Sequence, residues 1–305
     1  MRYQLAAHSL TGSRPSNQDR VGYAERDNAV LLVLADGLGG HEGGALAAET
    51  LTKSVVETFQ NVRQRRIERP SIFLALAVLQ AHRSIVLRGN MQHPPISPRT
   101  TCVLCLVQEG YAYWAHVGDS RLYHFRDGKL LARTHDHSVT EQLHLRGVLD
   151  EAEMRQHPQK AQLTKCVGGP HPPTVSLGPE TALTQDDNLL LCSDGLWEAY
   201  TQDELAVYLD FSSLEEGVEE MLLDAERRMK QKCDNLSAVS LRWEQGRTDA
   251  PPLESGGARE VTEHTLVDEA SHSIAREHQG AAKSEDLDST LRDLEAEINR
   301  LSRRL

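Results

Sequence analysis

Two apolar runs that each end in Asp-Gly constrain this chain more than any other feature of its sequence. The first is VLLVLADG, which ends at Asp36-Gly37, and the second is NLLLCSDG, which ends at Asp194-Gly195. Short apolar runs bounded by a turn dipeptide are typical of buried strands. Each run therefore delivers an aspartate to the end of a strand, and its glycine lets the chain turn away. Either aspartate alone also suits a helix cap or a simple turn.

Further aspartates stand in polar segments near both ends of the same region. Asp19 closes the segment RPSNQD, which begins at Arg14, and Asp234-Asn235 directly precedes the apolar run LSAVSLRW. Four aspartates without a converging set of His or Cys predict an oxygen-rich site that prefers Mg²⁺ or Mn²⁺ to structural zinc. Crowded carboxylates repel each other unless cations neutralise them, so the pattern implies its metals.

The residues before about 245 alternate between strand-like and helix-like patterns. The predicted strands are 30–35, 100–107, 111–117, 121–125, 189–192 and 236–243. Glu109-Gly110 and Asp127-Gly128 follow strand patterns and favour tight antiparallel connections. The predicted helices are Gly44–Gln60, Ser71–Arg88, Ser138–Arg146, Gln202–Leu209 and Leu214–Lys230, the last two after capping boxes at Thr201-x-x-Glu204 and Ser213-x-x-Glu216. Long helices around clustered strands indicate an α+β fold with largely antiparallel sheets.

The overall charge and the hydropathy exclude several classes of protein. The 305 residues carry 45 acidic and 33 basic side chains, a net charge of −12, which argues against nucleic acid or an anionic membrane surface as the main partner. No stretch approaches 18 uninterrupted apolar residues, and the start MRYQLAAHSLTGS is too polar for a signal peptide. We therefore expect no membrane span and a cytoplasmic protein.

The five cysteines suit a reducing compartment. Cys102 and Cys105 spell C-x-x-C, but they lie in the β-branched, apolar run TTCVLCLV, where positions i and i+3 face opposite sides of a strand. Buried free thiols are therefore favoured over a redox or zinc pair.

The composition changes sharply at Gly246. The segment GRTDAPPLESGGARE is rich in Pro, Gly and charge, which predicts a catalytic domain over 1–245 and a flexible linker over 246–283. Residues 284–305 differ again, because leucines and one isoleucine recur at alternating spacings of four and three. This spacing predicts an amphipathic or coiled-coil helix that mediates self-association, binds a partner or docks on its own domain.

Seven blocks of sequence, in order, resemble the type 2C, metal-dependent protein phosphatase (PPM) family, especially its bacterial branch. They are Arg14-x-x-Asn17-Gln18-Asp19, Ala35-Asp36-Gly37-Leu38-Gly39-Gly40-His41, Thr100-Thr101, Val117-Gly118-Asp119-Ser120-Arg121, Asp136-His137-Ser138, Cys192-Ser193-Asp194-Gly195-Leu196 and Asp234-Asn235. The resemblance covers about residues 8–243. It implies a four-layer α-β-β-α sandwich with two central, mainly antiparallel sheets and a dimetal site at one edge.

The resemblance also implies roles for individual residues. Asp36 would bridge two Mn²⁺ or Mg²⁺ ions, and the shells would be completed by the Gly37 carbonyl, Asp19, Asp194 and Asp234. Arg14 would hold the substrate phosphate through its planar fork. Asp119 matches an aspartate that binds a third, weaker metal in bacterial relatives. The alternative is a turn residue that closes YAYWAHVGDSRLYHF, with Arg121 as its salt-bridge partner.

Three positions depart from the pattern or invite misreading. Members from higher organisms commonly have a histidine, a proposed general acid, where Leu38 stands here. Bacterial relatives often have a histidine at the position of His41 instead. For His41 we favour packing or capping of the following helix over a role as general acid. Arg99 replaces a usual glycine. His135 and His137 resemble a metal pair, but the family match puts them at the start of a flap, about 138–169, and favours a structural role.

Three functions remain in competition. The first is hydrolysis of phosphoserine and phosphothreonine in proteins, opposing a Ser/Thr kinase in bacterial-type signalling or secretion control. The second is a non-catalytic interaction module with the same fold, which a degenerate metal site would favour. The third is a phosphatase of anti-sigma antagonists, whose members commonly carry sensor or membrane domains upstream.

Overall fold

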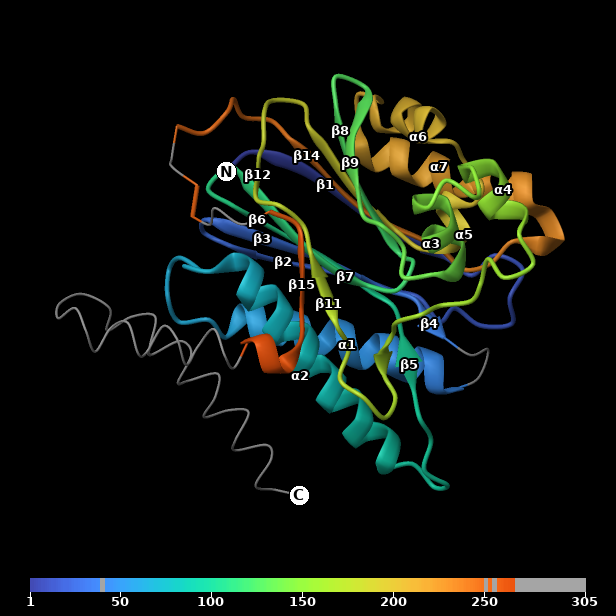
Figure 1. Ribbon diagram of the computed structural model, residues 1–305. Helices are drawn as coiled ribbons and strands as arrows, with labels where there is room; N and C mark the ends of the chain where they lie inside the picture. Colours follow the sequence, from blue (N-terminus) through green and yellow to red (C-terminus); the bar gives the residue numbers. More distant parts are fainter. Residues whose placement is uncertain (39–41, 250–251, 254–256, 267–305) are drawn as a thin grey trace, which may run out of the picture.

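Two antiparallel β-sheets pack face to face at the centre of the molecule, and helices cover the outer face of each sheet (Figure 1). The computed structural model describes residues 1–38, 42–249, 252–253 and 257–266. Buried apolar side chains form three clusters, one between the sheets and one under each helical layer. The predicted four-layer α-β-β-α sandwich is confirmed.

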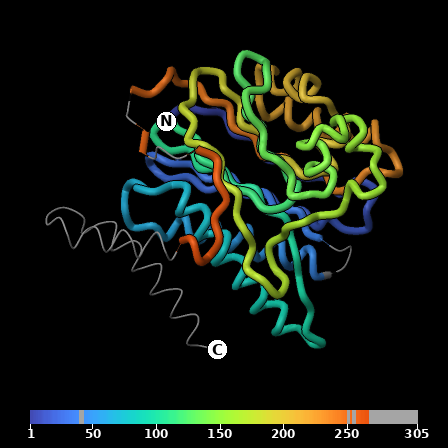
Figure 2. Tube along the Cα trace, in the orientation of Figure 1, coloured from blue at the N-terminus to red at the C-terminus, as the bar shows by residue number. Residues whose placement is uncertain are grey.

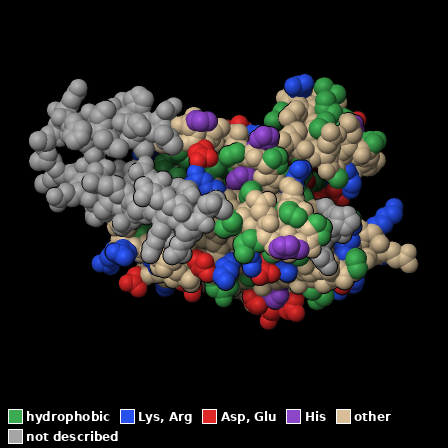
Figure 3. All heavy atoms as spheres, turned by 90° about the horizontal axis from the view of Figure 1, so that it is seen from below, with side chains coloured by type: hydrophobic (Ala, Val, Ile, Leu, Met, Phe, Trp, Pro, Cys, Tyr) green, Lys and Arg blue, Asp and Glu red, His purple; other side chains and the backbone are tan. Residues whose placement is uncertain are grey.

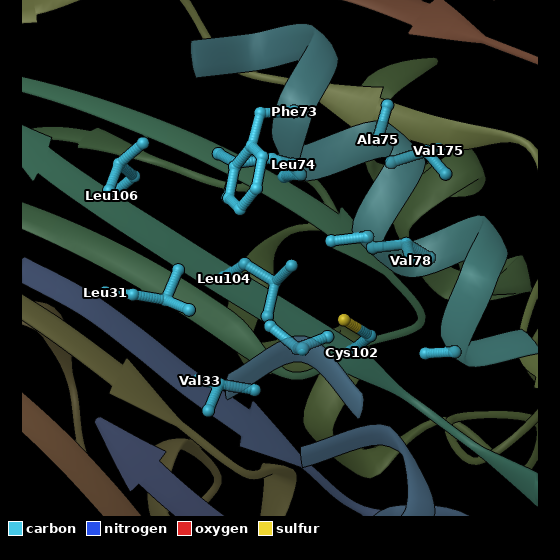
Figure 4. Packing of buried hydrophobic residues seen from close by; sticks show 14 of the residues in the cluster. Leu31, Val33, Phe73, Leu74, Ala75, Val78, Cys102, Leu104, Leu106 and Val175 are labelled. Atoms are coloured by element: carbon cyan, nitrogen blue, oxygen red, sulfur yellow. The ribbon is translucent and has the colours of Figure 1, made fainter. Parts of the chain in front are cut away.

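The seven-stranded sheet contains the first Asp-Gly strand. Its order is β15 (Arg259–Val261), β11 (Val175–Leu177), β7 (Tyr111–Val117), β6 (Cys102–Gln108), β3 (Ala29–Ala35) and β2 (Arg20–Arg26), and β12 (Thr181–Ala182) also pairs with β7. β3 is buried along its whole length because both faces of the sheet are covered. Leu31 and Val33 lie in the cluster under the helices (Figure 4), whereas Leu32 and Leu34 lie between the sheets.

The five-stranded sheet contains the second Asp-Gly strand. Its order is β1 (Tyr3–Leu10), β14 (Leu236–Trp243), β13 (Asn188–Cys192), β8 (Arg121–Arg126) and β9 (Lys129–Arg133). Its outer face is covered by α5 (Asp194–Trp197), α6 (Gln202–Leu209) and α7 (Leu214–Met229). Thr201 and Ser213 cap α6 and α7 as predicted, and at Thr201 both hydrogen bonds of the capping box are present.

The helical layer over the other sheet consists of α1 (Glu42–Gln60) and α2 (Pro70–Asn90). By length and composition, α2 could cross a membrane, but 67% of its most apolar stretch is buried inside the protein. Phe73, Leu74 and Val78 of this helix point into the cluster that also holds Leu104 (Figure 4). We therefore assign α2 to the core. On the face seen in Figure 3, the described acidic and basic side chains are interspersed and form no basic stripe.

The predicted turns and thiols are also found. Glu109 and Gly110 have φ angles of 53° and 82°, and Asp127 and Gly128 have 51° and 69°. Positive φ at both central residues belongs to the tight hairpin turn that matches strand twist. In β6, Cys102 and Cys105 lie in different clusters, on opposite faces of the strand, and burial raises the pKa of each thiol. All five cysteines are free.

A third, small sheet sits beside the larger ones and leads into the flap. It consists of β4 (Gly37–Leu38), β5 (Arg99–Thr100) and β10 (Val167–Gly168), with β5 in the middle. The flap contains α3 (Val139–Leu145), which begins after the N-cap Ser138 as predicted, and α4 (Glu151–Gln156).

Eight of the described strands lie outside the predicted ranges, namely β1, β2, β4, β9, β10, β11, β12 and β15. β1 and β2 have mixed polar sequences, and β15 lies inside the range expected to be a flexible linker. Residues 259–261 are ordered because Val261 is buried and its strand pairs with β11. The predicted helix over 284–305 lies outside the described residues.

Candidate active site

The backbone around Asp36 is fixed by two threonines. Asp36 follows the last residue of β3, and its carbonyl accepts bonds from the Thr101 amide and the Thr100 hydroxyl, both at 2.8 Å. The Asp36 amide donates to the Thr101 hydroxyl at 3.0 Å. The aspartate at this strand end is therefore held by neighbouring strands rather than by a mobile turn.

The glycines of the two Asp-Gly pairs serve close packing rather than a left-handed turn, which corrects the expectation that each lets the chain turn away. Neither Gly37 nor Gly195 has a positive φ. A Cβ on Gly37 would lie 2.4 Å from the backbone of Gly44 in α1, and a Cβ on Gly195 would lie 2.3 Å from the Asn235 carbonyl oxygen. Glycine is needed because backbone from another element comes too near for a side chain.

Asp194 and Asp119 lie on adjoining elements. Asp194 is the first residue of α5, directly after β13. Trp197, at the end of this short helix, donates from its indole nitrogen to the Asp119 carbonyl at 2.9 Å. Gly118, with φ of +108°, begins the link that carries Asp119 from β7 to β8.

This link joins the two sheets, because β7 belongs to one and β8 to the other. Asp119 therefore stands where the chain turns from one sheet to the other, but Arg121, its salt-bridge partner in the alternative interpretation, pairs with another carboxylate. Arg121 instead binds Asp136 through two hydrogen bonds of 2.8 Å, and its guanidinium stacks 3.6 Å from the centroid of the Trp197 ring.

The first polar segment is fastened to the start of β14. The Asn235 side chain accepts from the Gln18 amide at 2.9 Å and donates to the carbonyls of Thr11 and Ser16 at 2.8 and 3.1 Å. Through this connection Arg14 reaches Asp234 and donates two bonds, 2.8 Å from Nε to Oδ1 and 2.6 Å from Nη2 to Oδ2. Two segments from opposite ends of the domain thus form one wall of the site.

The five aspartates share one electrostatic environment. Burial raises the pKa of Asp36 well above its ordinary value, and Asp19, Asp194, Asp119 and Asp234 raise it further. Burial likewise raises the pKa of Asp194 well above its usual range, that of Asp19 to about 6 and that of Asp119 to about 7. The described part of the site therefore holds more negative charge than its own cations neutralise.

The side chains fit divalent metal ions. Both carboxylate oxygens of Asp19 are buried without a hydrogen bond of ordinary geometry among the described residues, although the hydroxyls of Ser237 and Ser193 lie near enough to lower its pKa partly. Buried carboxylate oxygens that lack partners, in an all-oxygen donor set, suit Mg²⁺ or Mn²⁺. Among the described residues, no three His, Cys, Asp or Glu side chains already stand at the spacing of metal ligands.

The structure brings together Arg14, Asp19, Asp36, Gly37, Asp119, Asp194 and Asp234. His41 lies outside the described residues, and Leu38 pairs with Arg99 between β4 and β5. The supporting roles of Thr101, Asn235 and Trp197 were not predicted. Thr101 and Asn235 belong to the matched motifs, so the sequence could have drawn attention to them. It could not show which backbone groups each side chain binds.

A two-sheet sandwich that gathers five aspartates at one end is the architecture of a metal-dependent hydrolase. Residues 7–236 match the family model described as protein phosphatase 2C, and the chain belongs to this family. The predicted enzyme class, a metal-dependent protein phosphatase, is confirmed.

Similar proteins carry concordant names. The serine/threonine phosphatase stp of Listeria monocytogenes is 27% identical over 223 residues, covering 72% of this chain and 82% of the relative. The solved structure of the S. agalactiae serine/threonine phosphatase is 27% identical, has a TM-score of 0.72 and covers 80% of this chain and 100% of that one. The catalytic domain of the serine/threonine protein phosphatase PstP, solved in complex with two manganese ions, is 24% identical, with a TM-score of 0.66 over 81% of this chain and 99% of that one.

Proposed function

We propose that this phosphatase hydrolyses phosphoserine and phosphothreonine in proteins at the cluster around Asp36. The observation that carries the assignment is the set of mutually repelling aspartates, of which Asp19 and Asp119 are buried, together with the buried carboxylate oxygens of Asp19. Asp36 would bridge two Mn²⁺ or Mg²⁺ ions, with the Gly37 carbonyl, Asp19, Asp194 and Asp234 around them and Asp119 for a third. When bound, the ions supply positive charge and lower the pKa of a water that attacks phosphorus.

The chain's own contribution is positioning. Thr100 and Thr101 hold the Asp36 backbone through its amide and its carbonyl, which fixes the point from which the carboxylate extends. The Arg14 side chain is 55% exposed and presents a planar fork that matches two phosphate oxygens. Asp234 occupies this fork in the structure, so we infer that Arg14 exchanges Asp234 for the substrate phosphate.

Replacing the central carboxylate tests this assignment. We expect Asp36→Asn to lower Mn²⁺-dependent turnover of a phosphothreonine peptide by roughly a thousandfold or more, because the bridging charge is lost. Calorimetric titration with Mn²⁺ should show weakened binding in the same variant. Asp127→Asn is the matched control, since it alters an Asp-Gly pair in a hairpin turn outside this carboxylate cluster.

Two outcomes would contradict the mechanism. The first is wild-type turnover that persists in a chelator, and the second is an Asp36→Asn variant as active as Asp127→Asn. The competing non-catalytic module predicts no turnover in any variant.

We also propose the setting in which the enzyme works. The five free cysteines suit the cytoplasm, where a Ser/Thr kinase would supply the phosphorylated proteins. The alternative substrate class, phosphorylated anti-sigma antagonists, is separated by comparing turnover on purified phosphoproteins of both kinds.

We keep the helix proposed over 284–305 as an association element. Truncation from Asp286 onward should leave turnover of a small aryl phosphate unchanged but alter the hydrodynamic size or the binding partners. Unchanged size together with unchanged partners would contradict this role.

A further inference from the structure

The described chain continues beyond the family match and returns to the sheet as β15. The match ends at residue 236. Within residues 257–266, here called the C-terminal segment, β15 pairs with β11 at the edge of the seven-stranded sheet (Figure 2). Val261 and Leu266 are 2% and 6% exposed and join the cluster under α2. Glu263 forms an ion pair with Arg83 of α2. Val261, Leu266 and Glu263 therefore anchor the segment without any contribution from its other side chains.

A row of polar side chains crosses three neighbouring strands at this edge. The pairing register places His116 of β7 opposite Ser176 of β11, and Ser176 opposite Glu260 of β15. His137 stacks on the His116 ring with a centroid distance of 4.6 Å. Directly opposed residues in a sheet lie within side-chain reach, so the row links the C-terminal segment to His137.

Hydrogen bonds along this row run in one direction. The Gly118 amide donates to His137 Nδ1 at 3.1 Å, so the proton of the neutral ring is on Nε2. That nitrogen donates to the Ser176 hydroxyl at 2.8 Å, and the hydroxyl donates to Glu260 Oε1 at 3.3 Å. The chain of donors ends on the carboxylate, the strongest acceptor in the row.

The same carboxylate holds the far end of the flap. Lys165, just before β10, donates to Glu260 Oε1 at 2.6 Å. Its neighbour Thr164 donates its amide to the His137 carbonyl at 2.7 Å, and Ser138 forms a bridge with Leu163. Glu260 therefore contacts one base of the flap directly and the other through Ser176 and His137.

This network also reaches the link that carries Asp119. Besides the amide bond, the Gly118 carbonyl accepts from the His137 amide at 2.8 Å. A Cβ on Gly118 would lie 2.7 Å from the Thr101 side chain, so the backbone before Asp119 is confined between His137 and Thr101. A displacement of His137 would therefore also displace the backbone at Asp119.

We propose that Glu260 is a positioning residue, through which the C-terminal segment fixes the base of the flap and the Gly118-Asp119 link for catalysis. The proposal rests on the proposed function of this site, but its first readout does not depend on turnover. It also identifies the C-terminal segment as the place where a partner could alter substrate binding without touching the metal site.

Three variants of the full chain test the role of Glu260. Glu260→Ala removes both the acceptor for Ser176 and the partner of Lys165, whereas Glu260→Gln keeps an acceptor oxygen and loses only the charge. Glu263→Gln is the matched control, because it removes an ion pair from the same segment on the α2 side. Hydrogen exchange of peptides that contain Gly118 and Thr164 is measured without metal, and steady-state kinetics are measured with Mn²⁺.

Glu260→Ala should accelerate exchange at Gly118 and Thr164 by roughly fivefold, the factor that corresponds to one ordinary hydrogen bond. Glu260→Gln should restore Gly118 but not Thr164, and Glu263→Gln should leave both unchanged. For Glu260→Ala we also expect KM for a phosphothreonine peptide to rise by about fivefold, with KM for a small aryl phosphate unchanged, because the flap would contact the protein part of the substrate.

Exchange at wild-type rates in Glu260→Ala would overturn the proposal, as would equal acceleration in Glu263→Gln, which would mean that the segment as a whole had loosened. If Glu260→Ala accelerated exchange at Thr164 but not at Gly118, the part of the proposal that runs through Ser176 and His137 to Gly118 would be overturned. If Asp36→Asn retained full turnover, the proposed function would fail while the exchange results still decided the role of Glu260.

Discussion

Two of the regions that bury negative charge in the described part of the molecule differ in whether their own side chains supply the counter-charge. Asp136 is 6% exposed and receives two bonds of 2.8 Å from Arg121, which is fully buried. Asp19 is 2% exposed, and neither of its carboxylate oxygens has such a partner among the described residues. The two carboxylates are equally hidden from water but differ in what neutralises them.

The difference separates structural charge from functional charge. A buried ion pair with good geometry is held together by its own attraction and does not need an external ligand. A buried group of like charges is costly until a cation enters. The region around Asp136 therefore serves the fold, whereas we propose that the region around Asp19 and Asp36 keeps a place for metal ions at the expense of stability.

Breaking the compensated region should have the largest effect on folding. Arg121→Leu leaves Asp136 buried and unpaired and removes the stacking on Trp197, so the free energy of unfolding should fall by about 3–5 kcal/mol. Urea denaturation measures this change. Arg227→Leu is the control, because the Arg227 pair with Glu220 is exposed and should contribute little to the free energy of unfolding.

The double variant Arg121→Leu/Asp136→Leu sharpens this test. Removing both charges should recover much of the lost stability, since no unpaired charge remains. A loss in Arg121→Leu no larger than in Arg227→Leu would show that the pair is not needed by the fold.

Relieving the uncompensated region should give a smaller change of opposite sign. Because the pKa of Asp19 is raised from 3.8 to about 6 in the folded state, its ionisation destabilises the metal-free protein as the pH rises through this range. Asp19→Asn should therefore be more stable than wild type above pH 7 by on the order of 3 kcal/mol. The advantage should vanish below about pH 4, where the Asp19 carboxyl of the wild type is neutral in both the folded and the unfolded state.

The comparison between variant and wild type isolates Asp19 from other titrating groups. Burial lowers the pKa of His116 to about 4 and also lowers that of His137, so these rings make stability rise with pH in the same window, and they cancel in the difference. Saturating Mn²⁺ should reverse the order of the two proteins. An Asp19→Asn protein that is less stable than wild type at pH 8 in a chelator would contradict the interpretation.

The smallest change in stability is expected for the ion pair of Arg14 with Asp234. This pair lies at the surface, beside the uncompensated aspartates. Arg14→Lys keeps the charge but loses the fork, so the free energy of unfolding should change by less than ~0.5 kcal/mol. Turnover per bound phosphopeptide should nevertheless fall by roughly tenfold, because lysine cannot hold two phosphate oxygens in a fixed geometry. Equal activity of the two proteins would remove Arg14 from the phosphate site.

The sequence predicted the two Asp-Gly strands because a strand buried on both faces is continuously apolar, as β3 is. It also predicted that Asp19 and Asp234 share a site, first from their common metal-binding chemistry and then from the family resemblance, although residues that distant carry no local signal for one another. Why Gly37 and Gly195 are glycines could not be predicted, because the close contacts come from Gly44 and Asn235 in other elements.

The failures lie where tertiary contacts override local sequence. β2 has several partly exposed residues, and its sequence RVGYAER shows little apolar periodicity. β15 is three residues long and has only Val261 to bury, so its strand conformation depends on the edge of β11. The pairing of Arg121 with Asp136 was also missed, because Asp119 is nearer in sequence but lies on a link between sheets.

The position of β14 determines when during synthesis this enzyme can begin to work. β14 ends at Trp243, yet it lies between β1 and β13 in the five-stranded sheet. Until the ribosome has released this strand, β1 has no neighbour and Arg14 is separated from Asp234, its partner 220 residues away. Such distant pairing makes folding wait for nearly the whole domain, so we expect a nascent chain to be inactive until β14 has left the ribosome.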